Sequence, residues 1–184
     1  FAMHKLEFID EAIQNYKYAI KINPKCADAY YNLGTILREQ GYLKKSEENF
    51  NLAIQFKPDY LDAFNNLGIL LQESGRLDEA KQKYKHAIQI QPKFADAHYN
   101  FSLINKYKKN SNTLELLKDA YADNNDSHSS MLLSFALAKA YDDIGEYSNS
   151  YACLAKGNLL RKNELNYNIK NDKEIINNIK NIFS

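Results

Sequence analysis

Apolar residues recur at helical spacing along the stretch from Leu61 to Pro92. Small and large apolar side chains return every three or four residues, as in amphipathic helices. Gly75 interrupts this pattern and Pro92 ends it, so the stretch predicts two helices joined by a tight turn. The residues of this stretch that match others 34 positions upstream are Leu67, Gly68, Leu71, Ala80, Tyr84, Ala87 and Pro92, whose counterparts are Leu33, Gly34, Leu37, Ser46, Phe50, Ala53 and Pro58.

The 34-residue period extends beyond these two units on both sides. Upstream only the second half of the pattern is present, and downstream the pattern begins again at Ala95 and then drifts. Small and large packing positions at this period, with a closing proline, resemble the tetratricopeptide repeat (TPR). The resemblance implies an all-α fold, namely a right-handed TPR superhelical solenoid of helix–turn–helix repeats with a C-terminal capping helix.

We expect a single TPR domain over residues 1–184. Because the first repeat lacks its first helix, we expect that the chain is cut from a longer protein and exposes apolar surface to a neighbouring copy. A short final helix that caps the open end is predicted by Ile175, Ile176, Ile179, Ile182 and Phe183. The expected segments are a half repeat with only a second helix (4–26), two full repeats (27–60 and 61–94), a divergent repeat (95–127), a divergent last repeat (128–163), and a linker with the capping helix (164–184).

Glycine occupies two kinds of position in the repeats. Gly75 and its equivalents are expected in turns, where glycine tolerates the left-handed conformation of a helix end. Gly34 and Gly68 lie in mid-helix, where glycine costs about 1 kcal/mol relative to alanine. We expect these two glycines to let the paired helix approach closely, against Ser46 and Ala80 respectively.

The charge balance excludes some classes of partner. The chain has 24 basic and 23 acidic residues, so its net charge is +1 and it lacks the basic excess of a nucleic-acid-binding surface.

No apolar run is long enough to span a membrane, and no signal peptide is visible. Cys26 and Cys153 lie far apart and form no CxxC motif, which fits a reducing compartment. We therefore expect a cytoplasmic protein.

The sequence contains no recognisable set of catalytic residues. His4, His86, His98 and His128 lie in different repeats and share no metal-ligand spacing. His98 occupies the repeat position of Tyr30 and Phe64, which indicates a packing role. No phosphate-binding glycine loop is present. We predict no catalytic site, no metal and no cofactor, and hence no enzymatic activity for this chain by itself.

Two series of polar residues recur with the repeat. Asn32, Asn66 and Asn100 are each preceded, four residues earlier, by Asp28, Asp62 and Asp96 respectively. Residues four apart share one helix face, and the first helices of TPR pairs line the concave groove. Neighbouring helices lie roughly 8–10 Å apart, which is about three residues of an extended peptide. An asparagine amide both donates and accepts, so the series predicts a ladder that holds a peptide backbone.

Other groove positions vary along the chain. If a peptide binds, selectivity would come from Tyr31, Asn65, Tyr99, Arg38, Gln72 and Lys106. An alternative stays open for both ladders: the asparagines bond to neighbouring helices, and the aspartates act as helix caps or favour the helix dipole.

The motif Asp-x-x-x-Asn-Leu-Gly occurs at residues 28–34 and 62–68. It resembles the TPR superhelix of O-linked N-acetylglucosamine transferases, which implies an asparagine ladder that holds substrate peptides and an aspartate ladder that adds selectivity. Residues 133–147 and 155–161 look instead like the last repeat of bacterial TPR–sulfotransferase proteins. That second resemblance implies a sulfotransferase domain downstream, and no catalytic residue carries over to this chain.

The sequence thus predicts a non-catalytic protein- or peptide-binding TPR scaffold. Its place would be the N-terminal, partner-recruiting part of a larger bacterial sulfotransferase-type protein. Two alternatives remain: a self-assembly module that associates through the exposed N-terminal half repeat and binds no groove ligand, and the substrate-recognition arm of a glycosyltransferase.

Overall fold

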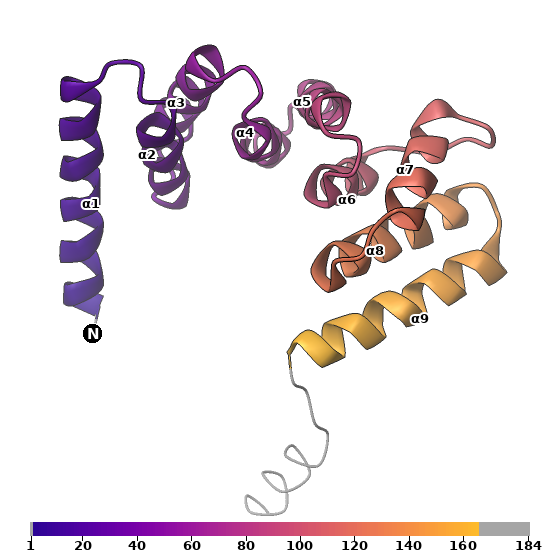
Figure 1. Cartoon of the computed structure of the whole chain (residues 1–184). Helices are drawn as coiled ribbons and strands as arrows, with labels where there is room; N and C mark the ends of the chain where they lie inside the picture. The colour runs from indigo at the N-terminus through magenta and orange to yellow at the C-terminus, as the bar shows by residue number, and fades with distance from the viewer. Residues whose placement is uncertain (1, 166–184) are drawn as a thin grey trace, which may run out of the picture.

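The structure, a computed structural model, describes the backbone of residues 2–165 and the side chains of residues 8–165. Within this range the chain forms helices and no strand (Figure 1). The predicted capping helix lies outside the described residues. The described helices are α1 (Ala2–Ile22), α2 (Ala27–Glu39), α3 (Leu43–Phe56), α4 (Leu61–Glu73), α5 (Leu77–Ile90), α6 (Ala95–Ile104), α7 (Asn112–Ala122), α8 (Ser127–Asp143) and α9 (Tyr147–Glu164).

The helices stack in chain order and confirm the predicted all-α solenoid. α2 packs with α3, α4 with α5, and α8 with α9, and α3–α4 and α5–α6 contacts join successive units. The core runs along the stack rather than through one centre, and its fully buried side chains include Phe50, Leu67, Tyr84, Leu117 and Leu133. Figure 1 shows the result, a curved chain of helices with α2, α4, α6 and α8 following its inner side.

Glycines with positive φ make the turns between paired helices. φ is 80° at Gly41, 75° at Gly75 and 79° at Gly145, which is the left-handed region that glycine enters without a steric cost. In the divergent repeat, Asn110 takes this role with φ 59°. Asparagine is one of the few other residues that tolerates this conformation.

The mid-helix glycines face aromatic rings. A Cβ added at Gly34 would lie 2.9 Å from Phe50 Cδ1, and one added at Gly68 would lie 2.8 Å from Tyr84 Cδ1. The expected approach at Ser46 is confirmed, because Ser46 Oγ donates to the Gly34 carbonyl at 2.7 Å, but we did not predict that an aromatic ring would lie beside each glycine. A small residue on the second helix permits the approach, but the ring of that helix occupies the gap that glycine leaves.

Gly157 on α9 belongs to the same kind of contact with the roles exchanged. A Cβ at Gly157 would lie 2.8 Å from Cε1 of Phe135 on α8. Here the first helix supplies the ring and the second helix supplies the glycine. The contact explains why Gly157 is buried within an otherwise largely exposed helix.

The divergent repeat does not form an ordinary helix pair. α6 spans only 10 residues, whereas α4 spans 13, and a loop over residues 105–111 follows α6. Tyr107 of this loop is buried, its ring meets Phe101 edge-on at 6.2 Å, and its backbone N–H donates to Asp143 at 3.0 Å. α6 then packs on α8, and α7 also packs on α8 rather than on α6.

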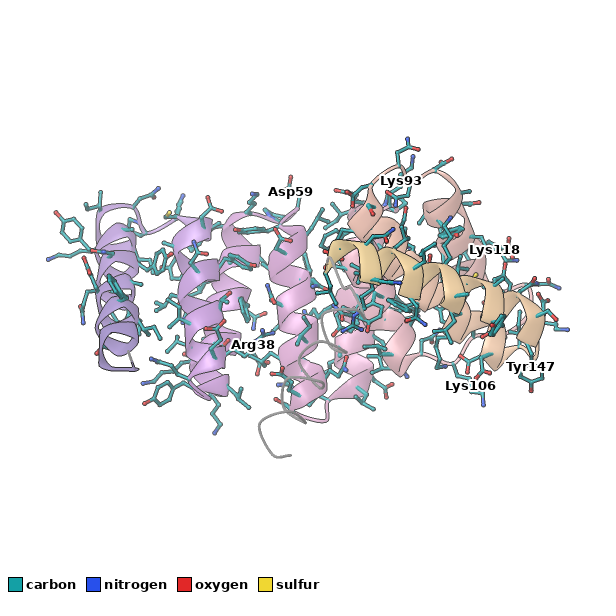
Figure 2. All side chains as sticks on the ribbon, turned by 90° about the horizontal axis from the view of Figure 1, so that it is seen from below. Arg38, Asp59, Lys93, Lys106, Lys118 and Tyr147 are labelled. Carbon is teal, nitrogen blue, oxygen red and sulfur yellow. The ribbon has the colours of Figure 1, made fainter. Side chains whose placement is uncertain are left out.

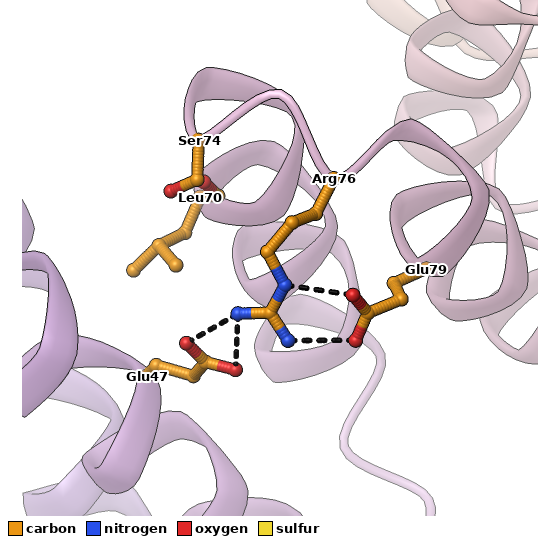
Figure 3. Close-up of polar contacts among 5 residues, drawn as sticks. All are labelled: Glu47, Leu70, Ser74, Arg76 and Glu79. Atoms are coloured by element: carbon orange, nitrogen blue, oxygen red, sulfur yellow. Dashed lines mark hydrogen bonds and ion pairs between the residues drawn. The ribbon is translucent and has the colours of Figure 1, made fainter.

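An ion-pair network joins two successive repeats on the second-helix side (Figure 3). Arg76 Nη1 donates to both carboxylate oxygens of Glu47 at 2.8 and 2.9 Å. Its Nε and Nη2 donate to Glu79 at 2.7 and 2.6 Å. Because Glu47 lies on α3 and Glu79 on α5, one guanidinium connects the two repeats; its hydrogen bonds and charge lower the pKa of Glu79.

Among the described helices, the N-terminal helix packs on a single neighbour, and it leaves apolar side chains exposed. α1 packs on α2. Its side chains Phe8, Tyr18 and Ile22 are 69%, 64% and 67% exposed. This exposure agrees with the expectation that the half repeat presents apolar surface.

Candidate functional site

The candidate groove follows the inner side of the curved chain. Its floor is formed by the first helices α2, α4, α6 and α8, and Figure 2 shows it from below, with Arg38 on the α2 side of the groove. At its C-terminal end the groove meets α9, which lies below α8 in Figure 1. A second helix, α9, which packs on α8, therefore borders the inner side at this end, where the repeat pattern implies another first helix.

Asn66 and Asn100 connect neighbouring first helices. Asn66 Nδ2 donates to Tyr31 Oη at 2.8 Å, and its Oδ1 accepts from Arg38 Nη1 at 3.5 Å. Asn100 Nδ2 donates to Asn65 Oδ1 at 2.9 Å. The bonds thus run from one repeat to the next. They support the alternative in which the asparagines bond to neighbouring helices.

The amide groups nevertheless keep some capacity for a ligand. A primary amide has two N–H donors and an oxygen acceptor. Within the described residues Asn100 uses one donor, Asn66 uses one donor and its oxygen, and the Asn32 side chain makes no hydrogen bond. All three side chains are partly exposed. Unused capacity is therefore greatest at Asn32 and Asn100.

The aspartates do not cap their helices. Asp28, Asp62 and Asp96 lie in the first turns of α2, α4 and α6, where a negative charge favours the helix dipole. The N-cap positions are held by Cys26, Tyr60 and Phe94, and none of these makes a side-chain cap bond. Asp28 and Asp62 are exposed, whereas Asp96 is partly buried. Two of the three carboxylates are thus accessible at the edge of the groove.

An aromatic pair lies beside these carboxylates. The rings of Tyr31 and Tyr60 are 5.0 Å apart, and Lys57 Nζ lies 4.2 Å from the Tyr60 ring centre. Burial, and then the neighbouring Asp28, raises the pKa of Tyr60. Burial, and then Asp62, raises the pKa of Tyr31. Both phenols are therefore neutral hydrogen-bonding groups at physiological pH.

Sequence reasoning missed Tyr60 as a groove residue. Tyr60 precedes α4, so it does not share a helix face with the ladder positions. The available signal was the equivalence of Tyr60 with Phe94, which also follows the closing proline by two residues.

The predicted selectivity positions have different surroundings. Tyr31, Asn65 and Arg38 take part in the bonds to the ladder asparagines. Gln72 Oε1 accepts from Tyr84 Oη at 3.1 Å, so its oxygen is held toward the second helix. Lys106 does not continue the helical series, because α6 ends at Ile104. Our placement of Lys106 on the helix face was therefore wrong.

Tyr99, the remaining predicted position, lines a pocket at the C-terminal end of the groove. The pocket has a volume of about 320 Å³ and lies between α6, α8 and α9. Its walls include Phe135 of α8 and Arg161 of α9. Sequence reasoning missed this pocket, because residues of α9 reach Tyr99 only through the altered packing of the last helices.

Comparison with known families identifies the repeats. A model described as a TPR repeat matches residues 4–41, and one described as a tetratricopeptide repeat matches residues 25–93. Residues 4–93 contain tetratricopeptide repeats. No curated protein matches the chain.

Solved structures share the architecture of nearly the whole chain. The crystal structure of MamA matches with a TM-score of 0.64 and 17% identity, over 89% of this chain and 95% of that chain. A structure from the functional characterization of Pseudomonas aeruginosa pilF matches with a TM-score of 0.62 and 21% identity, over 85% of this chain and 72% of that chain. At such identities the likeness concerns the fold alone.

Neither a membrane-spanning helix nor a metal site occurs among the described residues. No helix among them combines the length and apolarity needed to cross a membrane. Over the same range, no three His, Cys, Asp or Glu side chains group closely enough to hold a metal ion. The chemistry on the inner face is that of amides, phenols and a few charges, which suits recognition by hydrogen bonds.

Proposed function

We propose that the inner groove binds an extended peptide segment of a partner protein. TPR solenoids present extended concave surfaces of this kind for protein recognition. The proposal depends on one observation: the inner face combines unused amide capacity at Asn32 and Asn100 with an apolar pocket beside Tyr99. The amides suit a peptide backbone, and the pocket suits an apolar side chain.

The charges on the groove indicate which kind of side chain the peptide places at each end. Asp28 and Asp62 are exposed at the edge of α2 and α4, so they favour a basic or polar side chain at that end. Arg161 and Glu164 both line the pocket at the other end, so their charges offset each other, and the apolar side chains there determine the preference. The proposed ligand therefore has a basic residue toward α2 and an apolar residue toward α9.

The test uses a phage-displayed library of random peptides, panned on the purified chain. A recovered peptide is then titrated by fluorescence anisotropy against the unmodified chain and two variants. Asn32→Ala should weaken binding about two- to tenfold, since one net hydrogen bond is lost. Asn51→Ala, which changes an exposed asparagine on α3, is the matched control and should leave binding unchanged.

Two results would contradict the proposal. One is the recovery of no peptide that binds saturably. The other is equal affinity of the peptide for Asn32→Ala and the unmodified chain, which would show that the Asn32 amide does not contact the ligand.

A finer part of the proposal concerns the larger protein. The resemblance of residues 133–147 and 155–161 to TPR–sulfotransferase proteins supports a role as their partner-recruiting part. The gene downstream of the Ser184 codon tests this: a Pro-Arg-Ser-Gly-Thr-type donor loop there supports it. A nucleotide-sugar transferase fold would favour the glycosyltransferase arm instead.

Self-assembly is a second candidate, favoured by exposed apolar residues at both ends of the described stack. Phe8, Tyr18 and Ile22 are exposed on α1, and Tyr147 and Tyr151 are 69% and 75% exposed on α9. Sedimentation velocity over a concentration series tests it. Association that increases with concentration, and that Phe8→Ser and Tyr18→Ser abolish, would support self-assembly. A monomer at all concentrations would exclude it.

A further inference from the structure

A cavity lies where the divergent repeat departs from regular packing. It has a volume of about 360 Å³ and is lined by residues of α5, α6 and α7, which are neighbours in Figure 1. It forms because α7 packs on α8 and leaves the face of α6 that a second helix would normally cover. Volumes of a few hundred Å³ are typical of small-molecule sites. The cavity is separate from the inner groove.

A buried histidine on the cavity wall has an unused acceptor. His98 is 1% exposed, and its Nε2 lies 2.8 Å from the carbonyl oxygen of Pro92. A carbonyl oxygen can only accept, so Nε2 carries the proton and the neutral ring leaves Nδ1 as an acceptor. Burial lowers the pKa of His98, which keeps the ring neutral.

The His98 ring is part of the cavity wall. Its Nδ1 has no hydrogen bond within the described residues, so the ring brings an unpaired acceptor to the residues that line the cavity.

The opposite side of the cavity offers donors. Asn112 and Thr113, the first two residues of α7, line it. The Ser111 side chain makes no cap bond, and the Ser111 carbonyl accepts from the N–H groups of Leu114 and Glu115 only. The first two amides of α7 therefore stay unpaired in the described structure, where a helix N-terminus favours an anion.

The remaining wall combines apolar surface with one cation. Ile88, Phe101 and Leu116 supply the apolar part. Lys85 Nζ lies 5.7 Å from the centre of the Phe101 ring, and Lys85 forms no ion pair with a described residue. The cation adds to the preference for a negative group next to an apolar body.

We propose that this cavity binds a small aromatic carboxylic acid that carries a hydroxyl or N–H group. The carboxylate would accept from the first amides of α7 with Lys85 nearby, the ring would contact Phe101, Ile88 and Leu116, and the hydroxyl would donate to His98 Nδ1. This site does not depend on the peptide groove.

The test uses three related probes in a backbone-amide NMR titration of the ¹⁵N-labelled chain. 4-Hydroxyphenylacetate has all three groups, phenylacetate lacks the hydroxyl, and 4-methylphenol lacks the carboxylate. The first should shift the Asn112 and Thr113 amide signals saturably with a Kd of about millimolar or tighter. Phenylacetate should bind about two- to tenfold more weakly, and 4-methylphenol about tenfold or more.

The repeat itself supplies the matched variants. Tyr30, at the equivalent position of His98, donates its hydroxyl to the Pro24 carbonyl at 3.3 Å. His98→Tyr can therefore keep the bond to Pro92 while it removes the Nδ1 acceptor. Asn112→Pro removes one amide at the first helical position, where proline is tolerated, and Ser111 already has the extended backbone that precedes proline.

The variants should separate the two ends of the site. In His98→Tyr the hydroxyl probe should lose its advantage over phenylacetate, and in Asn112→Pro the carboxylate probes should lose about tenfold. Circular dichroism checks that each variant is folded; if either is not, Lys85→Gln, at an exposed position, replaces it and should weaken carboxylate binding. The absence of saturable shifts with every probe, or unchanged probe preferences in the folded variants, would overturn the proposal.

Discussion

The regular repeats and the divergent repeat begin alike and pack differently. α4 and α6 both begin with Ala-Asp-Ala or Leu-Asp-Ala and carry the ladder asparagine four residues after the aspartate. In the regular repeats a mid-helix glycine faces a ring of the second helix. In the divergent repeat Ser102 and Lys118 stand 34 positions after Gly68 and Tyr84. Neither half of the glycine–ring contact remains there.

The difference shows what holds a helix pair together. The surface of the first helix is nearly the same in both regions, yet α5 packs on α4 whereas α7 packs on α8. α7 has no ring to bury against α6. Packing on α8 instead removes more of its apolar surface from water, and its Leu114 and Leu117 are fully buried. The gap left behind is the cavity beside His98.

The largest expected effect comes from the ring in the regular repeat. Tyr84 is fully buried, so Tyr84→Ala should lower the free energy of unfolding by about 3–5 kcal/mol, through lost burial and the cavity left behind. Urea unfolding followed by circular dichroism measures this. Lys118→Ala changes the corresponding position of the divergent repeat and should have little effect. Similar losses in both variants would remove the distinction between the regions.

A smaller effect is expected from filling the glycine gap. Gly68→Leu places a branched side chain against the Tyr84 ring, and such overpacking costs roughly 1–3 kcal/mol. Leucine at the exposed Glu73 on the same helix is the control. An unchanged urea midpoint for Gly68→Leu would mean that the two helices separate freely, contrary to the contact described here.

The ladder asparagines should differ from one another in stability. Asn66→Ala loses its bonds to Tyr31 and Arg38, at about 0.5–1.5 kcal/mol net for each well-formed bond, so thermal unfolding should shift to lower temperature. Asn32→Ala loses no bond to a described residue and should melt close to the unmodified chain. Equal shifts in the two variants would show that both asparagines have the same structural role.

The smallest effect is expected from the exposed ion pairs of Arg76. Glu47→Gln removes the link to the preceding repeat, and Glu79→Gln removes a pair that lies close to Arg76 in sequence. Each should lower the melting temperature slightly at low ionic strength and less at high salt, because salt screens surface charges. A shift that does not change with salt would point to a cause other than the ion pairs.

The sequence by itself determined the helices and their order. The 34-residue period places the small and large residues, the turn glycines and the closing prolines, and these are local requirements of backbone conformation and helix faces. The same local reasoning located Asn32, Asn66, Asn100 and the aspartates on one face. It did not predict that α6 would end at Ile104 and leave Lys106 in a loop.

The tertiary structure decided which helices pack together and how the polar groups are paired. Whether Asn66 meets a ligand or Tyr31 depends on how two repeats are rotated against each other, which no single helix specifies. Likewise, the position of α7 depends on the competition between α6 and α8 for its apolar face. Both surfaces proposed for binding owe their shape to such long-range packing, because a groove or cavity exists only after several helices have taken their places.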